Sequence, residues 1–277
     1  MRVDLVPDEL WERVAPLLPP TPERRHHFPG RLRVPDRAAL AGVLYVLRTG
    51  VAWRDVPAEA VGCSGVTAWR RLRDWTEAGV WPRLHAALLS ELRRANLLDL
   101  DDCAVDGSHV RALKRGDHVG PSPVDRARPG SKHHVIVDRH GIPLAATLTG
   151  GNRHDVPQLL PLLPLLDAVP PIRGLRGRPR RKPRRLYADR GYDYDKYRRL
   201  LWKRGVKPMI ARRGAAHGSG LGKVRWVVER AFAWLHQFKR LRIRYERRAD
   251  LHQGLLELAC SVICLRRLQK SRCYPVQ

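Results

Sequence analysis

The sequence predicts a mixed α/β (α+β) fold in which a helical N-terminal region precedes a mixed sheet flanked by helices. Three observations support this prediction. Apolar residues recur at helical spacing through the first third of the chain, short apolar runs bounded by Gly, Pro or charged residues follow, and helical patterns return between and after those runs. At 277 residues, 43% of them hydrophobic, the chain is long enough for one large or two small domains with a real core.

The first region, residues 1–97, is expected to be helical throughout. Helices are predicted to begin at Asp8 and Asp36 and to cover residues 66–77 and about 81–95. The helix over 66–77 follows a Gly-containing turn, has Ser64 as its cap, and carries Arg70, Arg71 and Arg73. This arrangement is typical of a helix-turn-helix, whose second helix enters the major groove of DNA. A small helical bundle that only packs on the rest of the chain is the alternative.

The second region, residues 98–277, combines strands with helices. Five strands are predicted, over residues 102–106, 133–138, 144–148, 185–188 and 207–211. Helices are predicted over residues 155–167, 195–204, 222–240 and 251–268. Residues 111–131 and 170–185 are expected to be loops, and the second loop contains eight Lys or Arg and no acid. A loop of that composition is either a solvated surface strip or an arm that contacts phosphates.

Charge divides the chain at the same place. The sequence has 53 Lys and Arg against 27 Asp and Glu, a net charge of +26, yet residues 1–102 contain 15 basic and 14 acidic residues. An excess of this size attracts polyanions, which makes nucleic acid or an anionic membrane the expected partner class. No run approaches about 18 apolar residues, so a membrane-spanning helix is not expected. Aromatic residues are only 6%, which disfavours a protein that stacks single-stranded RNA.

Cysteine usage and the N-terminal sequence predict a cytoplasmic location. The five cysteines are scattered without a C-x-x-C pair, which argues against a disulfide framework or a zinc ribbon. Cys260 and Cys264 could share a helix face as metal ligands, but apolar packing is the favoured interpretation. Charged residues interrupt any apolar segment near the N-terminus, so no signal peptide is expected.

Three acids of the basic region stand on predicted core elements. Asp106 and Asp189 end predicted strands, where mixed sheets present catalytic groups, and Glu229 lies in a predicted helix four residues after Arg225. Each has a structural alternative, because the aspartates could cap loops and Glu229 could pair with Arg225. Three convergent carboxylates would repel one another unless Mg²⁺ or Mn²⁺ neutralised them, and two such ions can cleave a phosphodiester. Asp138 is held in reserve as a further ligand.

Several motifs resemble those of the DDE transposases of bacterial insertion sequences, in the insertion-sequence-five group. The motifs cover residues 106–108, 132–138, 151–155, 188–193 and 225–235, and the similarity runs over nearly the whole chain. The resemblance implies an RNase H-like catalytic domain over 98–277, with Asp106, Asp189 and Glu229 as the metal-binding triad, after a DNA-binding helix-turn-helix domain over 1–97. The related four-type group shows a Tyr-x2-Arg-x3-Glu-x6-Lys motif, in which Gly222 and His236 replace the Tyr and the Lys here.

The resemblance also implies an activity and partners. Such a transposase binds the terminal inverted repeats of its element, cleaves DNA and transfers 3′ ends to target DNA, using Mg²⁺ or Mn²⁺. It would act near the nucleoid, as a homodimer or larger assembly on double-stranded DNA. The residues expected to contact DNA are Arg70, Arg71, Arg73, Arg180, Arg181, Lys182, Arg225, Lys239 and Arg240. A catalytically inactive or domesticated regulator derived from a transposase is the alternative, against which the intact triad argues.

Overall fold

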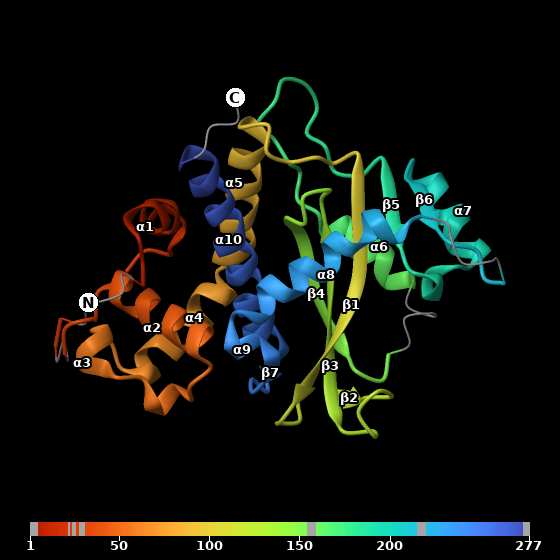
Figure 1. Ribbon diagram of the computed structural model, residues 1–277. Coiled ribbons are helices and arrows are strands. Elements are labelled where there is room, and N and C mark those ends of the chain that lie inside the picture. Colours follow the sequence, from red (N-terminus) through yellow and green to blue (C-terminus); the bar gives the residue numbers. More distant parts are fainter. Residues whose placement is uncertain are drawn as a thin grey trace.

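The computed structural model describes residues 5–21, 23, 26–27, 31–153, 159–214 and 220–273. The N-terminal helices form one side of the molecule and the sheet lies on the other (Figure 1). Between them, helix α5 (Val80–Arg94) packs against the long C-terminal helix α10 (Ala249–Cys273). No described helix is both long enough and apolar enough to cross a membrane.

The N-terminal region is helical, as predicted. Besides α5, its elements are α1 (Asp8–Val14), the 3₁₀ turn η1 (Ala15–Leu17), α2 (Asp36–Thr49), the 3₁₀ turn η2 (Trp53–Asp55), α3 (Ala58–Val61) and α4 (Gly65–Glu77). Helix α2 ends where Gly50 adopts a left-handed conformation with a φ of 75°. Ser64 caps α4, because its side-chain oxygen accepts a 3.3 Å hydrogen bond from the Thr67 N–H. Local sequence signals therefore set both helix ends.

The segment before α4 has the turn length of a helix-turn-helix. Three residues, 62–64, join α3 to α4, and Gly62 in this turn has a φ of 81°. Because α3 is only four residues long, α4 receives its main support from α2. The two helices approach closely at Gly42, where an added Cβ would lie 2.8 Å from the Cβ of Ala68. Helix α4 is thus held in place by close packing against α2.

The second region is built on a mixed sheet. Its strands are β1 (Asp102–Ala112), β2 (Gly120–Pro121), β3 (Pro129–Val137), β4 (Pro143–Gly150), β5 (Arg185–Ala188), β6 (Lys207–Ile210) and β7 (Ile243–Arg244). Strand β3 pairs antiparallel with β1 and β4, whereas β1, β5 and β6 run parallel. The five predicted strands are confirmed. The predicted loop over 111–131 is partly wrong, because Arg111 pairs with Gly130 and extends β1 and β3 beyond their predicted ends.

Helices cover the sheet. They are α6 (Leu159–Ala168), the 3₁₀ turn η3 (Arg190–Tyr192), α7 (Asp195–Lys203), α8 (Gly222–His236), α9 (Lys239–Arg242) and α10. Residues 222–240 form two helices rather than the single predicted one, since the buried Phe238 is extended (ψ 97°) between α8 and α9. Leu235, Phe238 and Leu241 all enter one core, so apolar spacing continues through the break. The start of the helix predicted over 155–167 lies outside the described residues.

The two regions share one hydrophobic core. Its buried members include Leu88 of α5, Leu98 of the connecting segment and Leu255 of α10. Gly254 permits the close packing of α10, because an added Cβ would lie 2.7 Å from the Thr76 hydroxyl oxygen and 2.9 Å from a ring carbon of Trp81. Cys260 and Cys264 are buried in the same core, as apolar packing predicted. The change in composition near residue 97 therefore falls inside a continuously packed molecule.

Candidate active site

Asp106 lies in the middle of β1 rather than at the end of a strand. The strand continues to Ala112, and Asp106 stands opposite Val135 of β3. Its Oδ1 accepts a 2.8 Å hydrogen bond from the Gly107 N–H, and its Oδ2 accepts one of 2.8 Å from Arg225. The side chain is 23% exposed. The carboxylate is therefore fixed by the sheet while staying in reach of solvent.

Asp189 follows the last residue of β5, the strand that pairs parallel with β1. The register of these strands ends with Ala104 opposite Tyr187, and its continuation by two residues would set Asp189 level with Asp106. Neighbouring strands are about 4.8 Å apart. The Oδ1 of Asp189 is buried and has no hydrogen-bond partner among the described residues. Gly191 lies against this carboxylate, since an added Cβ would come within 2.9 Å of that oxygen.

Arg225 links Glu229 to Asp106. Glu229 lies one turn after Arg225 on α8, and this helix packs across β1, β3 and β5. The Arg225 guanidinium donates to Glu229 Oε1 at 3.0 Å and to Asp106 Oδ2 at 2.8 Å. The helical pairing expected from sequence is thus present, and the same arginine also reaches across to a strand 119 residues earlier in the chain. Sequence spacing gave no sign of that second contact.

The three acids do not form one cluster of ligands. Among the residues that the structure describes, no three His, Cys, Asp or Glu side chains make a group that could hold a metal ion. Arg225 supplies the positive charge between Asp106 and Glu229, while Asp189 adds its unsatisfied oxygen from the neighbouring strand. All the carboxylate oxygens are hard donors of the kind that Mg²⁺ and Mn²⁺ prefer. Two of the acids are therefore paired through the Arg225 guanidinium, and the third follows the strand that is parallel to β1.

The loop that carries Asp189 is held by Asp193. This buried carboxylate accepts 2.7 Å hydrogen bonds from the Arg198 side chain and from the Arg213 N–H. Burial would raise the pKa of Asp193, but these two donors outweigh it and lower that pKa. Arg213 in turn donates to the carbonyl oxygens of Arg190 and Gly191 at 3.2 Å. The backbone that follows Asp189 is consequently held by Arg213 and Asp193.

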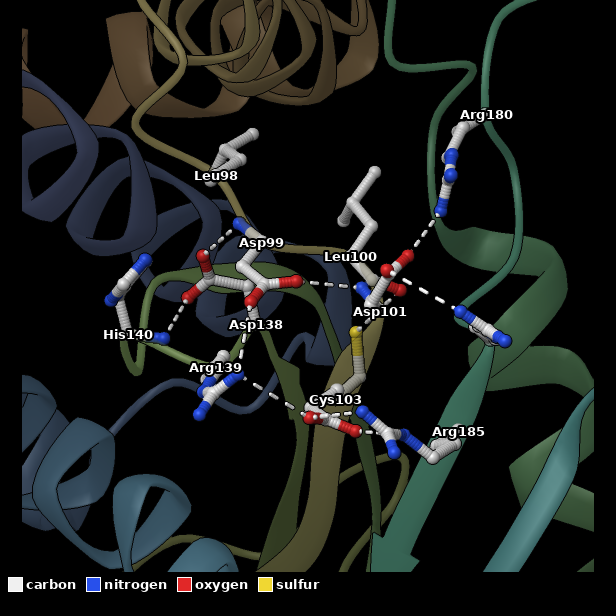
Figure 2. Close-up of polar contacts among 12 residues, drawn as sticks. Leu98, Asp99, Leu100, Asp101, Cys103, Asp138, Arg139, His140, Arg180 and Arg185 are labelled. Atoms are coloured by element: carbon white, nitrogen blue, oxygen red, sulfur yellow. Dashed lines mark hydrogen bonds and ion pairs between the residues drawn. The ribbon is translucent and has the colours of Figure 1, made fainter.

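Asp138, the reserve ligand, caps the β3–β4 turn instead. Its fully buried carboxylate accepts hydrogen bonds from the N–H groups of Asp99 (3.0 Å), His140 (2.9 Å) and Ile142 (2.8 Å), two of which are drawn in Figure 2. Burial raises the pKa of Asp138 to about 7, against the effect of these donors. The side chain thus ties the turn to the segment that enters β1.

The three arginines expected to contact DNA from α4 differ in their surroundings. Arg71 is only 13% exposed and binds Asp36 at 3.0 Å. Arg73 is half-buried, donates to Asp74 at 2.8 Å and lies 5.8 Å from the ring of Trp69. Arg70 is exposed. The structure therefore leaves Arg70 as the member of this set that faces outward, while Arg71 supports the helix.

The basic loop over 170–185 is partly tied to the protein. Arg180 donates to Asp101 at 2.8 Å, a contact visible in Figure 2, and Lys182 donates to the Arg204 carbonyl at 3.1 Å. The backbone of Ile172 also bridges to Arg180. Arg181 is exposed. The loop is thus anchored at its base, and it presents several cations at the surface beside β5.

Lys239 and Arg240 lie in opposite environments. Lys239 is exposed at the start of α9, whereas the Arg240 side chain is 5% exposed and binds Glu246 at 2.7 Å. Arg240 also donates to the Val51 carbonyl at 3.1 Å, in the connection between α2 and α4. This burial differs from the expected DNA contact, because the guanidinium is used to join the N-terminal helices to the second region.

The two positions that depart from the four-type motif stand at the ends of α8. Gly222 is the first residue of that helix, and nothing lies within 4 Å of the position that a Cβ would take there. His236 is the last residue; burial first, and then the charge of Arg242, lower its pKa. His236 therefore does not supply the cation that Lys gives the motif.

Comparisons with known proteins give consistent matches. Residues 98–264 match the family described as "Transposase DDE domain", and residues 6–85 match "Putative transposase of IS4/5 family". The chain is 62% identical over 153 residues to a Burkholderia cepacia protein named "Putative transposase for insertion sequence element IS402", covering 55% of this chain and 71% of that protein. A second B. cepacia protein, "Insertion element IS402 uncharacterized 16.2 kDa protein", is 55% identical over 124 residues, which are 44% of this chain and 84% of that protein.

Similarity to solved structures is weaker. The "Crystal structure of the Mos1 Strand Transfer Complex" gives a TM-score of 0.26 at 16% identity, covering 87% of this chain and 81% of that one. The "Mos1 transposase paired-end complex with left transposon end" gives 0.27 at 14% identity, covering 93% and 86%. At these TM-scores the likeness carries no argument about the site.

Proposed function

Since the chain belongs to the transposase DDE-domain family and is a transposase of an insertion sequence, we propose that it cleaves the ends of its element and joins the 3′ ends to target DNA. The observation that carries this proposal is the contact of Arg225 with both Asp106 on β1 and Glu229 on α8. Asp189 follows β5, the strand that runs parallel to β1. The sequence separates Asp106 from Asp189 by 83 residues and Asp189 from Glu229 by 40, so the proposal depends on the fold rather than on proximity in the sequence.

The donor chemistry of these residues fits a divalent cation, while the described side chains form no three-ligand group in this conformation. The donors are hard oxygens, one of them is a buried carboxylate oxygen without a hydrogen-bond partner among the described residues, and Gly191 keeps side-chain atoms away from it. Asp106, Asp189 and Glu229 would hold the ion. When bound, such an ion activates the attacking oxygen and stabilises the leaving oxygen of a phosphodiester.

The chain's own side chains would bind and orient the DNA. Arg225, which already neutralises two carboxylates, limits their mutual repulsion and keeps them in place before DNA arrives. Exposed cations of the basic loop, such as Arg181, and Lys239 at the other end of the sheet are suited to backbone phosphates. The half-buried position of Asp106 and Arg225 removes part of the solvent from the contact with the phosphate.

Helix α4 is proposed to recognise the terminal inverted repeats. Its outer face carries Arg70, one turn after Val66, whose side chain is 54% exposed. Arginine suits guanine edges and an apolar side chain suits the thymine methyl group in the major groove. Arg70→Ala should cost about 1–3 kcal/mol of binding to the element ends and relax their sequence preference. Assembly of two or more copies on DNA stays a prediction.

Strand cleavage on labelled element ends tests the proposed activity. Wild-type protein should nick these ends in the presence of Mg²⁺ or Mn²⁺ and should not do so in chelator. Asp106→Ala and Glu229→Gln should bind the same DNA and lose cleavage by at least about a hundredfold. Asp125→Asn, in an exposed loop where the acid lies 3.8 Å from Arg128, is the matched control and should cleave normally.

The outcomes separate the alternatives. Full cleavage by either Asp106→Ala or Glu229→Gln would remove these acids from the site. Specific binding by the wild-type protein without any metal-dependent cleavage would instead indicate a DNA-binding regulator derived from a transposase.

A further inference from the structure

A basic pocket, here named the α8–α10 pocket, lies between α8, α10 and the β3–β4 turn. Its volume is about 410 Å³, and its polar wall consists of His140, Arg230, Gln237, Arg266, Arg267 and Lys270. No Asp or Glu is among the described residues that line it. None of the DNA contacts expected from sequence lies in this pocket. It is thus a separate concentration of positive charge, built by tertiary packing.

Arg230 is fixed at one wall without being neutralised. Its guanidinium carbon lies 4.4 Å from the ring centroid of Trp226 and 5.1 Å from that of Trp234. Its Nη2 donates to the His140 carbonyl at 2.6 Å, while its Nε is buried and has no hydrogen-bond partner among the described residues. Aromatic faces orient a guanidinium but leave its charge and its in-plane donors available. The Arg230 guanidinium therefore keeps its charge and an N–H donor with which it can bind an anion.

Helix α10 forms the opposite wall with three more cations. Arg266 and Arg267 are adjacent, and Lys270 follows them by four and three residues, so Lys270 is a helical neighbour of both arginines. Within the described part of the chain none of the three pairs with an acid, and the Nε of Arg267 is also buried without a hydrogen-bond partner. Burial lowers the pKa of Arg266, and burial followed by the charge of Arg267 lowers that of His140. Among the residues that the structure describes, no Asp or Glu forms an ion pair with these three side chains of α10.

Position on α8 relates the pocket to the acids. Arg230 directly follows Glu229, and Trp234 is nine residues after Arg225. At 1.5 Å per residue those nine residues span about 13 Å of helix axis. One strand of duplex DNA has a phosphate every 3.4 Å of its axis, so this length corresponds to about four phosphates. A backbone that crosses α8 at Arg225, which contacts Asp106 and Glu229, can thus reach the pocket at Trp234 within the same half turn.

We propose that the α8–α10 pocket binds backbone phosphates of the duplex DNA on which the acids act, about four nucleotides from the reacting bond. The inference rests on the proposed function, since it takes DNA as the substrate. The paired N–H donors of an arginine guanidinium match phosphate oxygens. Cations of α8 and α10 line the pocket and no described acid does, which favours an anionic ligand over a neutral one. The pocket fixes the angle at which the DNA passes over α8.

The test compares two triple variants with equal loss of charge. The pocket variant removes the three cations of α10 by the substitutions Arg266→Gln, Arg267→Gln and Lys270→Gln. The α7 variant removes three exposed cations of α7 by the substitutions Lys196→Gln, Arg199→Gln and Lys203→Gln. Affinity for a labelled duplex end is measured from low to physiological salt, with Ca²⁺ present to prevent cleavage. The pocket variant should bind about tenfold more weakly, and the slope of log affinity against log salt should become shallower by about two, while the α7 variant changes little. Equal unfolding midpoints confirm that both variants are folded.

A second arm locates the phosphate. Duplexes that carry one neutral methylphosphonate, placed singly at each of the six nucleotides on either side of the cleaved bond, are bound to wild type and to the pocket variant. A methylphosphonate near the fourth nucleotide should weaken binding by the wild-type protein and leave binding by the pocket variant unaffected. The neutral phosphate and the three substitutions would remove the same contact.

Three results would overturn the proposal. The first is a pocket variant whose affinity for the duplex and whose salt slope are unchanged. The second is a loss of affinity at every methylphosphonate position that simply adds to the loss caused by the pocket variant. The third is a wild-type protein that inorganic triphosphate stabilises against unfolding while the pocket variant binds DNA normally, which would assign the pocket to a small phosphate ligand. Cleavage of the same duplex by the wild-type protein when Mg²⁺ replaces Ca²⁺ keeps the proposed function intact. Failure of the wild-type protein to bind and cut the duplex would remove both the proposed function and this inference.

Discussion

Arg225 donates a 2.8 Å hydrogen bond to Asp106 across 119 residues of sequence, and the same guanidinium holds Glu229 at 3.0 Å. A divalent cation that binds these acids has to compete with this arginine. Arg225→Gln should therefore raise the affinity for Mn²⁺ about three- to tenfold, the scale set by a charged hydrogen bond in a partly exposed site. Mn²⁺ titration by calorimetry measures it. Arg248→Gln, which breaks an exposed pair with Asp250, is the control, and unchanged or weaker Mn²⁺ binding by Arg225→Gln would contradict the competition.

Arg240 and Glu246 form a buried ion pair, with side chains 5% and 2% exposed. Removing one partner leaves an uncompensated buried charge, so Glu246→Gln or Arg240→Met should lower the free energy of unfolding by about 3–5 kcal/mol. Urea denaturation provides the measurement. The exposed contact of Arg248 with Glu77 offers a comparison, because Glu77→Gln should cost less than about 1 kcal/mol. Equal losses in the buried and exposed pairs would be inconsistent with this account.

Gly65 has no room for a side chain. An added Cβ would lie 1.6 Å from the Trp53 carbonyl oxygen, a backbone atom that cannot rotate away. Gly65→Ala should therefore displace the start of α4, cost about 1–3 kcal/mol of unfolding free energy and weaken binding to the element ends. Gly222→Ala is the matched control, since open space surrounds that position at the start of α8. Similar stability of the two variants would refute the steric argument.

Asp138 should make stability depend on pH. Burial raises its pKa from 3.8 to about 7 in the folded protein, so the native state keeps a proton that the unfolded chain releases. The stabilisation is complete below about pH 4 and is lost as pH rises to about 7, with a slope near 1.4 kcal/mol per pH unit at most. Asp138→Asn should remove this component. Unfolding free energies of both proteins at pH 5 and pH 8 test it, and a constant difference between them would exclude it.

Sequence patterns predicted the helices and strands better than the tertiary contacts between them. The mixed sheet flanked by helices, which the apolar patterns predicted, is confirmed, as is the cap of α4. Two-residue strands such as β7 leave no periodicity to detect, and the apolar spacing that predicted one helix through Phe238 could not reveal its extended backbone. Arg240 shows the same limit, because only tertiary packing distinguishes a buried arginine from an exposed one.

The candidate acids could be selected from sequence because so few acids remain in the basic region. Their partners could not be, since the contact from Arg225 to Asp106 depends on how α8 crosses the sheet. The α8–α10 pocket was missed for a related reason. Its cations come from two helices and a turn, and no single stretch of sequence unites them.

The packing of α10 against α5 limits how this protein can be re-engineered. A recognition module is usually exchanged as an independent unit, but here the α5 face that carries Leu88 packs against α10 in the same core as the sheet. A chimera with a new target preference would therefore have to keep α5 and the hydrogen bond from Arg240 to the Val51 carbonyl. Only the exposed side chains of α4 would be replaced. Retargeting by surface substitution is the route that this architecture leaves open.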